Sequence, residues 1–255
     1  VCLSSRKDFR DAVIAARTAF GDWGSRAAFN RGQVLYRIAE MLEGRKAQFI
    51  EELYRQDSTM EQAEKEVSRS IERLIYYAGW CDKFQQLFST VNPVASPHFN
   101  FSAPEPTGVV SIIAPQNNSL IGLVSVIAPI IAGGNTCVVL ASAGKPLCSV
   151  TFAEVLATSD VPGGVVNILT GKPGELLSWF SDHMDVNALV YCENDQESIL
   201  KIQQKATLNL KRVLLWNNYN WMDESAQNPY LINDAQEIKT TWHPIENIGG
   251  AKAGY

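Results

Sequence analysis

One asparagine of this chain lies where a reaction could be assisted. Asn117 is in the loop 115–120, directly after the β-branched run 109–114, which predicts a strand buried on both faces. Ligands of open α/β sheets bind at the carboxyl ends of the strands. An amide at that place can donate a hydrogen bond to a developing oxyanion. The alternative is an asparagine that bonds its own backbone in a turn.

The thiols and imidazoles predict neither a disulfide framework nor a metal site. The cysteines are odd in number and form no CxxC pair: Cys2, Cys81, Cys137, Cys148 and Cys192. Reduced thiols in a cytoplasmic setting are the simplest interpretation. Only Cys192 lies at a turn before a helix, where a thiolate can be stabilised. Its acidic neighbours oppose that, so we expect a structural thiol. The three histidines are widely separated, which disfavours a metal centre.

The hydrophobic pattern of 108–140 predicts the element that positions Asn117. The segment reads as strand, loop, helix, glycine turn and strand, and the helix 120–132 is apolar nearly all round, so it belongs in the core. Such a βαβ unit normally forms a parallel sheet with a right-handed crossover. Helices and strands continue to alternate as far as 216. The predicted fold class is therefore α/β, with a doubly wound, Rossmann-like parallel sheet.

The remaining segments predict a helical start and an irregular end. We expect one helix that Gly21 ends, a second that Ser25 caps, a third at 45–56 and a long fourth at 60–88. Four prolines make 91–106 a connector. We divide the chain into a helical region (1–106), a Rossmann-like core (107–216) and a C-terminal part (217–255). The last part comprises an irregular linker, a strand near 235–242 and a glycine-rich tail.

The composition of the chain limits the classes of partner that it could bind. A formal net charge of −5 argues against nucleic acid and anionic membrane surfaces. The longest apolar run, 120–132, is too short to span a membrane. Because the chain begins at Val1, we expect it to be a piece of a longer protein.

Four segments resemble the aldehyde dehydrogenases. YYAGWCDKF (76–84) is similar to the family's YYAGWADK helix, and VPGGVVNILTG (161–171) to its LPPGVVNVVTG segment. EPTGVVSIIAP with IAPIIAGGNTCVVL resembles the entry to its cofactor domain. IKTTWHPIENIGGAKAGY resembles its final stretch, where a strand pairs across subunits. The chain most resembles the partial second module of two-module (family-sixteen) aldehyde dehydrogenases, which lacks the catalytic domain.

The resemblance implies a reaction whose working groups are largely missing here. The family uses a cysteine nucleophile, a glutamate base and a nicotinamide cofactor, and its PWNFPL loop reads PQNNSL in this chain, keeping Asn117. The ribose-binding KPSE reads ASAG at 141–144, and the glycine turn GSTEVG reads CENDQE at 192–197. Asn209 stands in place of the general-base glutamate, and the nucleophile segment is absent. We therefore favour the turn interpretation of Asn117.

These comparisons predict a chain without catalytic activity that serves assembly. The expected pocket is vestigial and consists of Pro115, Gln116, Asn117, Ala141 and Cys192, with no metal and no cofactor; NAD is possible but disfavoured. We expect a homodimer, pairing with a preceding aldehyde dehydrogenase module, or another protein partner. Contact would use the helix 60–88 and an interaction strand of five residues: Ile238, Lys239, Thr240, Thr241 and Trp242. The alternatives are a residual NAD(P)-binding domain, or part of a parent enzyme whose activity lies in another module.

Overall fold

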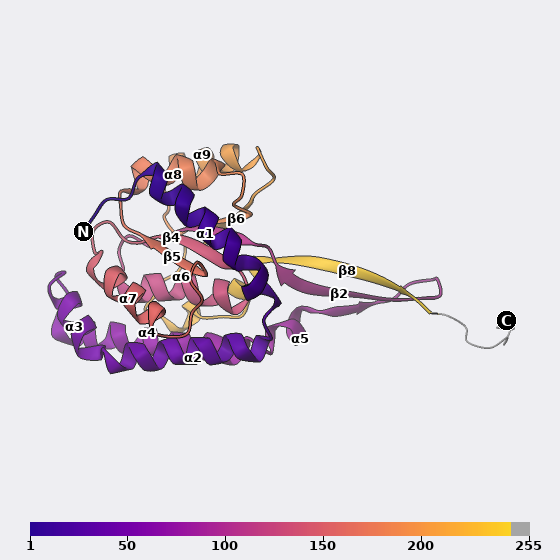
Figure 1. Cartoon of the computed structure of the whole chain (residues 1–255), viewed down its shortest axis with the longest axis horizontal. Helices are drawn as coiled ribbons and strands as arrows, with labels where there is room; N and C mark the ends of the chain where they lie inside the picture. Colours follow the sequence, from indigo (N-terminus) through magenta and orange to yellow (C-terminus); the bar gives the residue numbers. More distant parts are fainter. Residues whose placement is uncertain (246–255) are drawn as a thin grey trace, which may run out of the picture.

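In the computed structural model, which describes residues 1–245, five parallel strands form the centre of the body (Figure 1). Their spatial order is β5-β4-β3-β6-β7. Their bounds are β3 Val109–Ile113, β4 Thr136–Leu140, β5 Val166–Leu169, β6 Ala188–Tyr191 and β7 Arg212–Leu215. In register, Val110 lies beside both Cys137 and Ala188. The predicted α/β class with a Rossmann-like parallel sheet is confirmed.

Helices cover both faces of this sheet. Alternate strand residues point to opposite faces. Val109 and Ile113 therefore contact the layer of α1 (Arg6–Ser25), α8 (Pro173–Asp182) and α9 (Gln196–Ala206). The layer on the other face contains α6 (Leu120–Ala132), α7 (Leu147–Ala157), α2 (Ala28–Gly44), α3 (Lys46–Tyr54) and α4 (Met60–Trp80). Figure 1 shows the two layers above and below the sheet.

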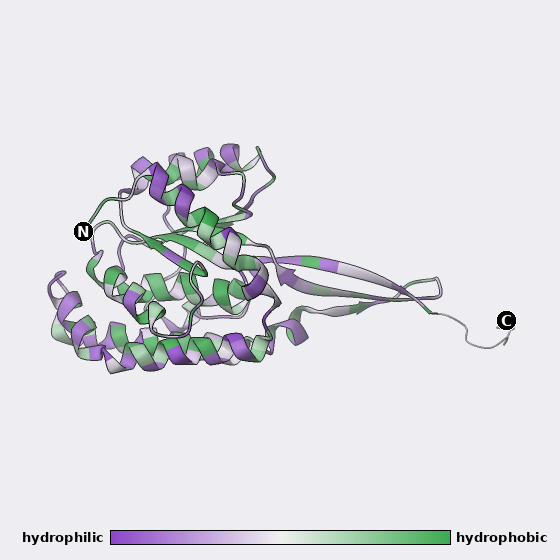
Figure 2. Ribbon diagram, in the orientation of Figure 1, coloured by the Kyte–Doolittle hydropathy of each residue, from purple (hydrophilic) through white to green (hydrophobic). Residues whose placement is uncertain are grey.

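Helix α6 is the centre of the larger core. All thirteen of its residues are buried, between the sheet on one side and α4 on the other. Figure 2 shows hydrophobic residues concentrated in this helix and in the sheet, whereas the outer helices carry hydrophilic residues on their exposed sides. The prediction that 120–132 is a core helix is confirmed.

The predicted boundaries of the first helices are wrong. α1 continues through Gly21 because Trp23 is fully buried beyond it and its indole Nε1 donates to the Ile131 carbonyl (3.1 Å). Ser25 is the last residue of α1, and Ala27 is the N-cap of α2. The predicted helix 60–88 breaks after Trp80, and a separate short helix, α5 (Phe84–Phe88), follows.

The predicted connector 91–106 instead forms strands of an arm. β1 (Thr90–Asn92) and β2 (His98–Pro106) pair antiparallel, and β2 pairs along nine residues with β8 (Gln236–Pro244), giving the order β1-β2-β8. This sheet projects from the body (Figure 1). Its prolines misled the prediction. Pro104 and Pro106 lie where a backbone N–H would point away from β8 and beyond the end of β1, a position that proline tolerates.

The segment between β7 and β8 is packed rather than loose. It contains a 3₁₀ turn, η1 (Glu224–Ala226), and the helix α10 (Tyr230–Asp234). Trp221, Leu231 and Ile232 are buried in the larger core. The predicted glycine-rich tail at 247–255 lies outside the described residues.

Candidate functional site

Three loops meet at the carboxyl edge of the parallel sheet, where the sequence placed the vestigial pocket. They follow β3, β4 and β6, which are neighbours in the sheet. Pro115, Ala141 and Cys192 are buried here, and Gln116 is half-buried. Asn117 is exposed, and its side chain forms no hydrogen bond with any residue in the range 1–245. The turn interpretation of Asn117 thus finds no backbone partner for its amide within this range.

Gln116 binds these loops to one another. Its Nε2 donates to the Ala114 carbonyl (2.8 Å), and its Oε1 accepts from the Ala143 backbone N–H (2.9 Å). Its own carbonyl accepts from the Ser142 Oγ (2.7 Å). The groups of Gln116 that could face a ligand at this edge are therefore engaged within the chain.

A carboxylate of the chain also binds a backbone donor of this loop. Glu193 Oε1 accepts from the Gln116 backbone N–H (2.7 Å). Two residues later, Asp195 caps α9 and accepts from the N–H groups of Glu197 (3.2 Å) and Ser198 (3.3 Å). The Ser198 hydroxyl, followed by these backbone donors, lowers the pKa of Asp195. The end of α9 that would attract an anion is already supplied with negative charge.

A second carboxylate caps the central helix from the neighbouring helix α4. Glu66 of α4 accepts from the N–H groups of Leu120 (2.8 Å) and Ile121 (3.0 Å) at the start of α6. Burial raises the pKa of Glu66, and these hydrogen bonds partly offset that rise. Glu66 thereby satisfies backbone donors that a bound anion could otherwise use.

The hollows of the body differ in their suitability for a ligand. One of about 420 Å³ lies between α8 and α9, and its two lysines are already engaged: Lys201 with Glu197 (2.6 Å) and Lys205 with Asp182 (2.7 Å). Another, of about 440 Å³, is lined by the N-terminal residues and the loop 143–146.

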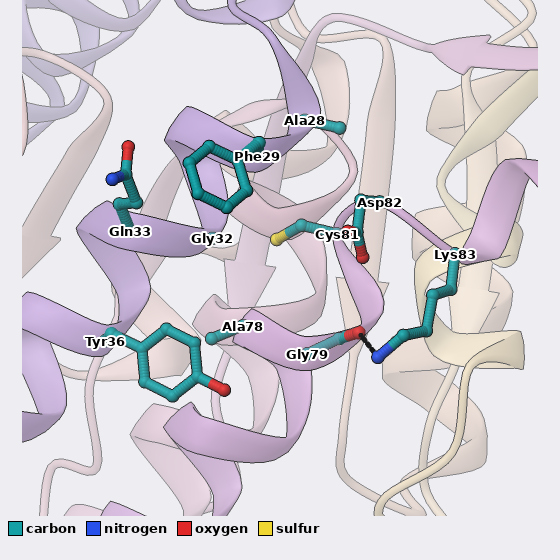
Figure 3. A pocket seen from close by; sticks show the side chains of 10 residues that line it. All are labelled: Ala28, Phe29, Gly32, Gln33, Tyr36, Ala78, Gly79, Cys81, Asp82 and Lys83. Atoms are coloured by element: carbon teal, nitrogen blue, oxygen red, sulfur yellow. Dashed lines mark hydrogen bonds between the residues drawn. The ribbon is translucent and has the colours of Figure 1, made fainter.

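Figure 3 shows a smaller pocket between α2 and α4. Phe29 and Tyr36 line it from α2, and the Lys83 Nζ beyond α4 donates to the Gly79 carbonyl (2.7 Å). Its volume of about 170 Å³ is below that of ordinary small-molecule sites. Phe29 is 68% exposed.

The sequence of the body matches a known family. A model of the aldehyde dehydrogenase family matches residues 1–217. The chain belongs to the aldehyde dehydrogenase family. The resemblance expected from the four motifs is thus confirmed at the level of the family.

Individual relatives agree. The chain is 34% identical over 221 residues to cytosolic 10-formyltetrahydrofolate dehydrogenase of Homo sapiens, covering 84% of this chain and 24% of that protein. It is 32% identical over 215 residues to an aldehyde dehydrogenase of Aspergillus niger, covering 83% of this chain and 42% of the relative. It therefore spans only a minor part of these relatives' length.

Solved structures give the same result. An NAD⁺ complex of aldehyde dehydrogenase from Bacillus cereus superposes with a TM-score of 0.77 at 25% identity. A putative aldehyde dehydrogenase from Burkholderia cenocepacia gives 0.79 at 28% identity. Each covers 84% of this chain and 44% of the solved chain.

In this aldehyde dehydrogenase-family chain, Asn209 does not lie at the carboxyl edge of the sheet, where ligands of open α/β sheets bind. It lies in the turn before β7, at the amino edge of the sheet and so opposite Asn117, where its Nδ2 donates to the Met184 and Val186 carbonyls (both 3.1 Å). The first residue after β7 is Trp216, which is buried and donates through Nε1 to Asp234 (3.1 Å). The motif comparison was therefore misaligned at this segment. The residue at the carboxyl edge, directly after β7, is Trp216.

The cysteine thiols of the aldehyde dehydrogenase body are shielded from ionisation. Burial raises the pKa values of Cys137 and Cys148 to about 12, and it raises that of Cys192 well above the usual value, with Glu193 adding to the effect. Cys137 and Cys148 are both fully buried. Cys2 is exposed, and no group of three metal-ligating side chains occurs within the described range.

The arm provides the second candidate site. Residues 238–244 of β8 are all exposed, and β8 is the last strand in the order β1-β2-β8. The five residues of the predicted interaction strand lie within it. They pair with β2 of the same chain, so only their outer edge is available to another chain. No helix in the described part of the chain is long and apolar enough to cross a membrane.

The contact between Gln116 and Glu193 was not predicted from the sequence. A signal was present, because the two residues follow β3 and β6, and strands adjacent in a parallel sheet bring their following loops together. The order of the strands was needed before that signal could be used. Glu66 lies 54 residues before Leu120 and had no local signal.

Proposed function

We propose that this chain is a non-catalytic module of an aldehyde dehydrogenase-family protein and that it acts in assembly. Three features of the body support the absence of catalysis. The loops at the carboxyl edge are bonded to one another through Gln116. Trp216 stands directly after β7. The cysteines at this end of the sheet carry raised pKa values.

The observation that carries the assembly role is the exposed outer edge of β8. An unpaired strand edge presents a row of N–H and C=O groups that tends to recruit another strand. The arm holds this edge away from the body (Figure 1). The partner we propose is a second copy of the chain, a preceding aldehyde dehydrogenase module, or both. The setting is cytoplasmic, which the free cysteines support.

Sedimentation velocity over a concentration series tests this role. The chain should form a dimer, or a complex with the preceding module, and Thr240→Pro should abolish it. Circular dichroism of the variant should match the wild type, because an outward-facing edge position tolerates proline. The proposal fails if the chain stays monomeric at high concentration and also does not bind the preceding module.

The rival function is residual NAD(P) binding without chemistry. The cavity of about 420 Å³ between α8 and α9 favours it. Against it stand Glu193 on the loop donor and the sequence 141–144, which offers no lysine or glutamate for a ribose. The residues present thus do not fit the cofactor well. Calorimetric titration with NAD and NADP should show no micromolar binding, and such binding would favour the rival.

The same reasoning predicts that the isolated chain has no dehydrogenase activity. With a small aldehyde and NAD, the chain should produce no NADH above the blank. Activity of the longer protein would then lie in another module. Turnover by the isolated chain would contradict the proposed absence of catalysis and leave the assembly role to its own test.

A further inference from the structure

The loop after β4 is held by a residue of the neighbouring loop. Gln116 follows β3, the middle strand of the three neighbours β4-β3-β6. Its Oε1 accepts from the Ala143 N–H (2.9 Å), and its carbonyl accepts from the Ser142 Oγ (2.7 Å). The same Oγ accepts from the Lys145 N–H (3.2 Å). The conformation of the loop after β4 therefore depends on the position of Gln116.

Glu193 fixes the position of Gln116 from the other side. It belongs to the loop after β6, and its Oε1 accepts from the Gln116 N–H at 2.7 Å, the length of a charge-assisted hydrogen bond. Within residues 1–245, this is the one hydrogen bond between the loop after β6 and the loop after β3. Both side chains are half-buried, so the contact lies at the surface of the edge, where a ligand could reach it.

An anionic ligand would use the same kind of donor. Phosphate groups bind to backbone N–H groups at the carboxyl ends of parallel strands and at the helix N-termini that follow them. Here side chains of the chain bind such donors: Glu66 at α6, Asp195 at α9, and Gln56, whose Oε1 accepts from the Leu147 N–H (2.9 Å), at α7. Of these acceptors and Glu193, only Glu193 connects two loops of the edge with each other.

We infer that Glu193 is an intramolecular latch that takes the place of an anionic ligand. Its carboxylate holds the Gln116 N–H, and Gln116 in turn holds the loop after β4 closed. A phosphate group would have to displace this carboxylate, against the repulsion of like charges. The inference rests on the proposed absence of catalysis and identifies the residue that excludes phosphate-bearing molecules from the edge.

Exchange of individual backbone amides, measured by NMR, tests the latch. In Glu193→Ala, the Gln116 amide should exchange roughly tenfold faster or more, the factor expected for losing a hydrogen bond to a charged acceptor. The Ala143 amide should also exchange faster, because its acceptor is positioned through Gln116. Glu193→Gln keeps an acceptor and should retain most of the protection. Glu197→Ala is the matched control, since this neighbouring carboxylate is exposed and pairs with Lys201 (2.6 Å).

Titration with inorganic pyrophosphate, followed by the chemical shift of the Gln116 amide, tests the exclusion. The shift should change and saturate in Glu193→Ala but not in the wild type or in Glu197→Ala. An unchanged Ala143 exchange rate or an unchanged shift in Glu193→Ala overturns the latch and leaves the proposed absence of catalysis standing. Saturable binding of pyrophosphate by the wild type overturns the latch as well, and it also favours the rival function of nucleotide binding.

Discussion

A single buried guanidinium anchors the segment that connects β7 with β8 of the arm. Arg73 of α4 is 1% exposed and has no carboxylate partner among the described residues. It donates to the Ser125 Oγ (2.7 Å) and to three carbonyls of the segment that follows β7: Trp221 (3.2 Å), Asp223 (3.1 Å) and Ala226 (3.3 Å). Burial lowers its pKa. The side chain therefore fastens this segment to α4 and α6.

Arg73→Met should reduce the free energy of unfolding by about 2–4 kcal/mol, because it leaves buried carbonyls without a donor. Urea denaturation measures the change. Arg69→Met is the control, since Arg69 pairs with Glu72 on the exposed side of the same helix and such pairs contribute less than about 1 kcal/mol. Equal effects of the two substitutions would contradict the fastening role.

The buried ammonium group of Lys211 should make the free energy of unfolding depend on pH. Its Nζ donates to the Ser181 (2.8 Å) and His183 (2.9 Å) carbonyls at the end of α8, and burial lowers its pKa to about 8. The unfolded chain binds this proton more tightly than the folded chain, so stability should rise as the pH increases from 8 towards 10.5.

The rise should be of order 1–3 kcal/mol and absent in Lys211→Met. Urea denaturation at several pH values measures it, and Lys172→Met, an exposed lysine, should retain the rise. If Lys211→Met shows the same rise as the wild type, Lys211 is not the group that causes the pH dependence.

At the scale of elements, hydrophobic periodicity predicted the helices and strands whose burial follows from their own sequence. It failed for elements whose conformation depends on contacts with residues far along the chain. The helix 120–132 and the five parallel strands follow from apolar runs. β2 could not be predicted, because its prolines are tolerated only through the particular register with β8, more than 130 residues later. The end of α1 likewise depends on a pocket for Trp23 that α6 provides.

The turn before β5 gives a prediction at this scale. Gly164 has φ +91°, and a Cβ there would lie 2.5 Å from the Ala15 carbonyl oxygen of α1. Gly164→Ala should destabilise the fold by about 2–4 kcal/mol, through backbone strain and displacement of α1.

Gly163→Ala is its neighbouring control. No atom lies within 4 Å of a Cβ at Gly163, so the change should be within about 0.5 kcal/mol. Thermal unfolding of the two variants should separate clearly. Similar melting temperatures would mean that the contact between this turn and α1 does not limit stability.

At the scale of the whole molecule, the candidate site was only partly predictable. The sequence located the loop of Asn117 at the correct edge of the sheet, and it identified the segment that becomes β8. It misplaced Asn209, because a motif was compared without knowledge of where β7 begins. It also missed that Glu193 and Gln116 meet, since that contact depends on the order of strands β3 and β6 in the sheet.

The molecule as a whole thus combines a closed carboxyl edge with an exposed strand edge. In the proposed function, the first disfavours a ligand and the second offers a place at which a chain pairs. Hydrogen exchange of individual β8 amides tests this account most directly, because the two edges of the strand report separately. The Ile245 N–H donates to the Pro97 carbonyl (2.9 Å), and such bonds recur at every second residue of an antiparallel pair, so the odd-numbered residues of β8 bond to β2.

The amides of Thr241 and His243, which face β2, should be protected at every concentration. Those of Ile238, Thr240 and Trp242, which face outward, should exchange freely in the dilute chain and become protected as it assembles, alone or with the preceding module. If the assembled species forms while these three outward amides still exchange freely, the outer edge of β8 is not the assembly surface, and the central claim fails.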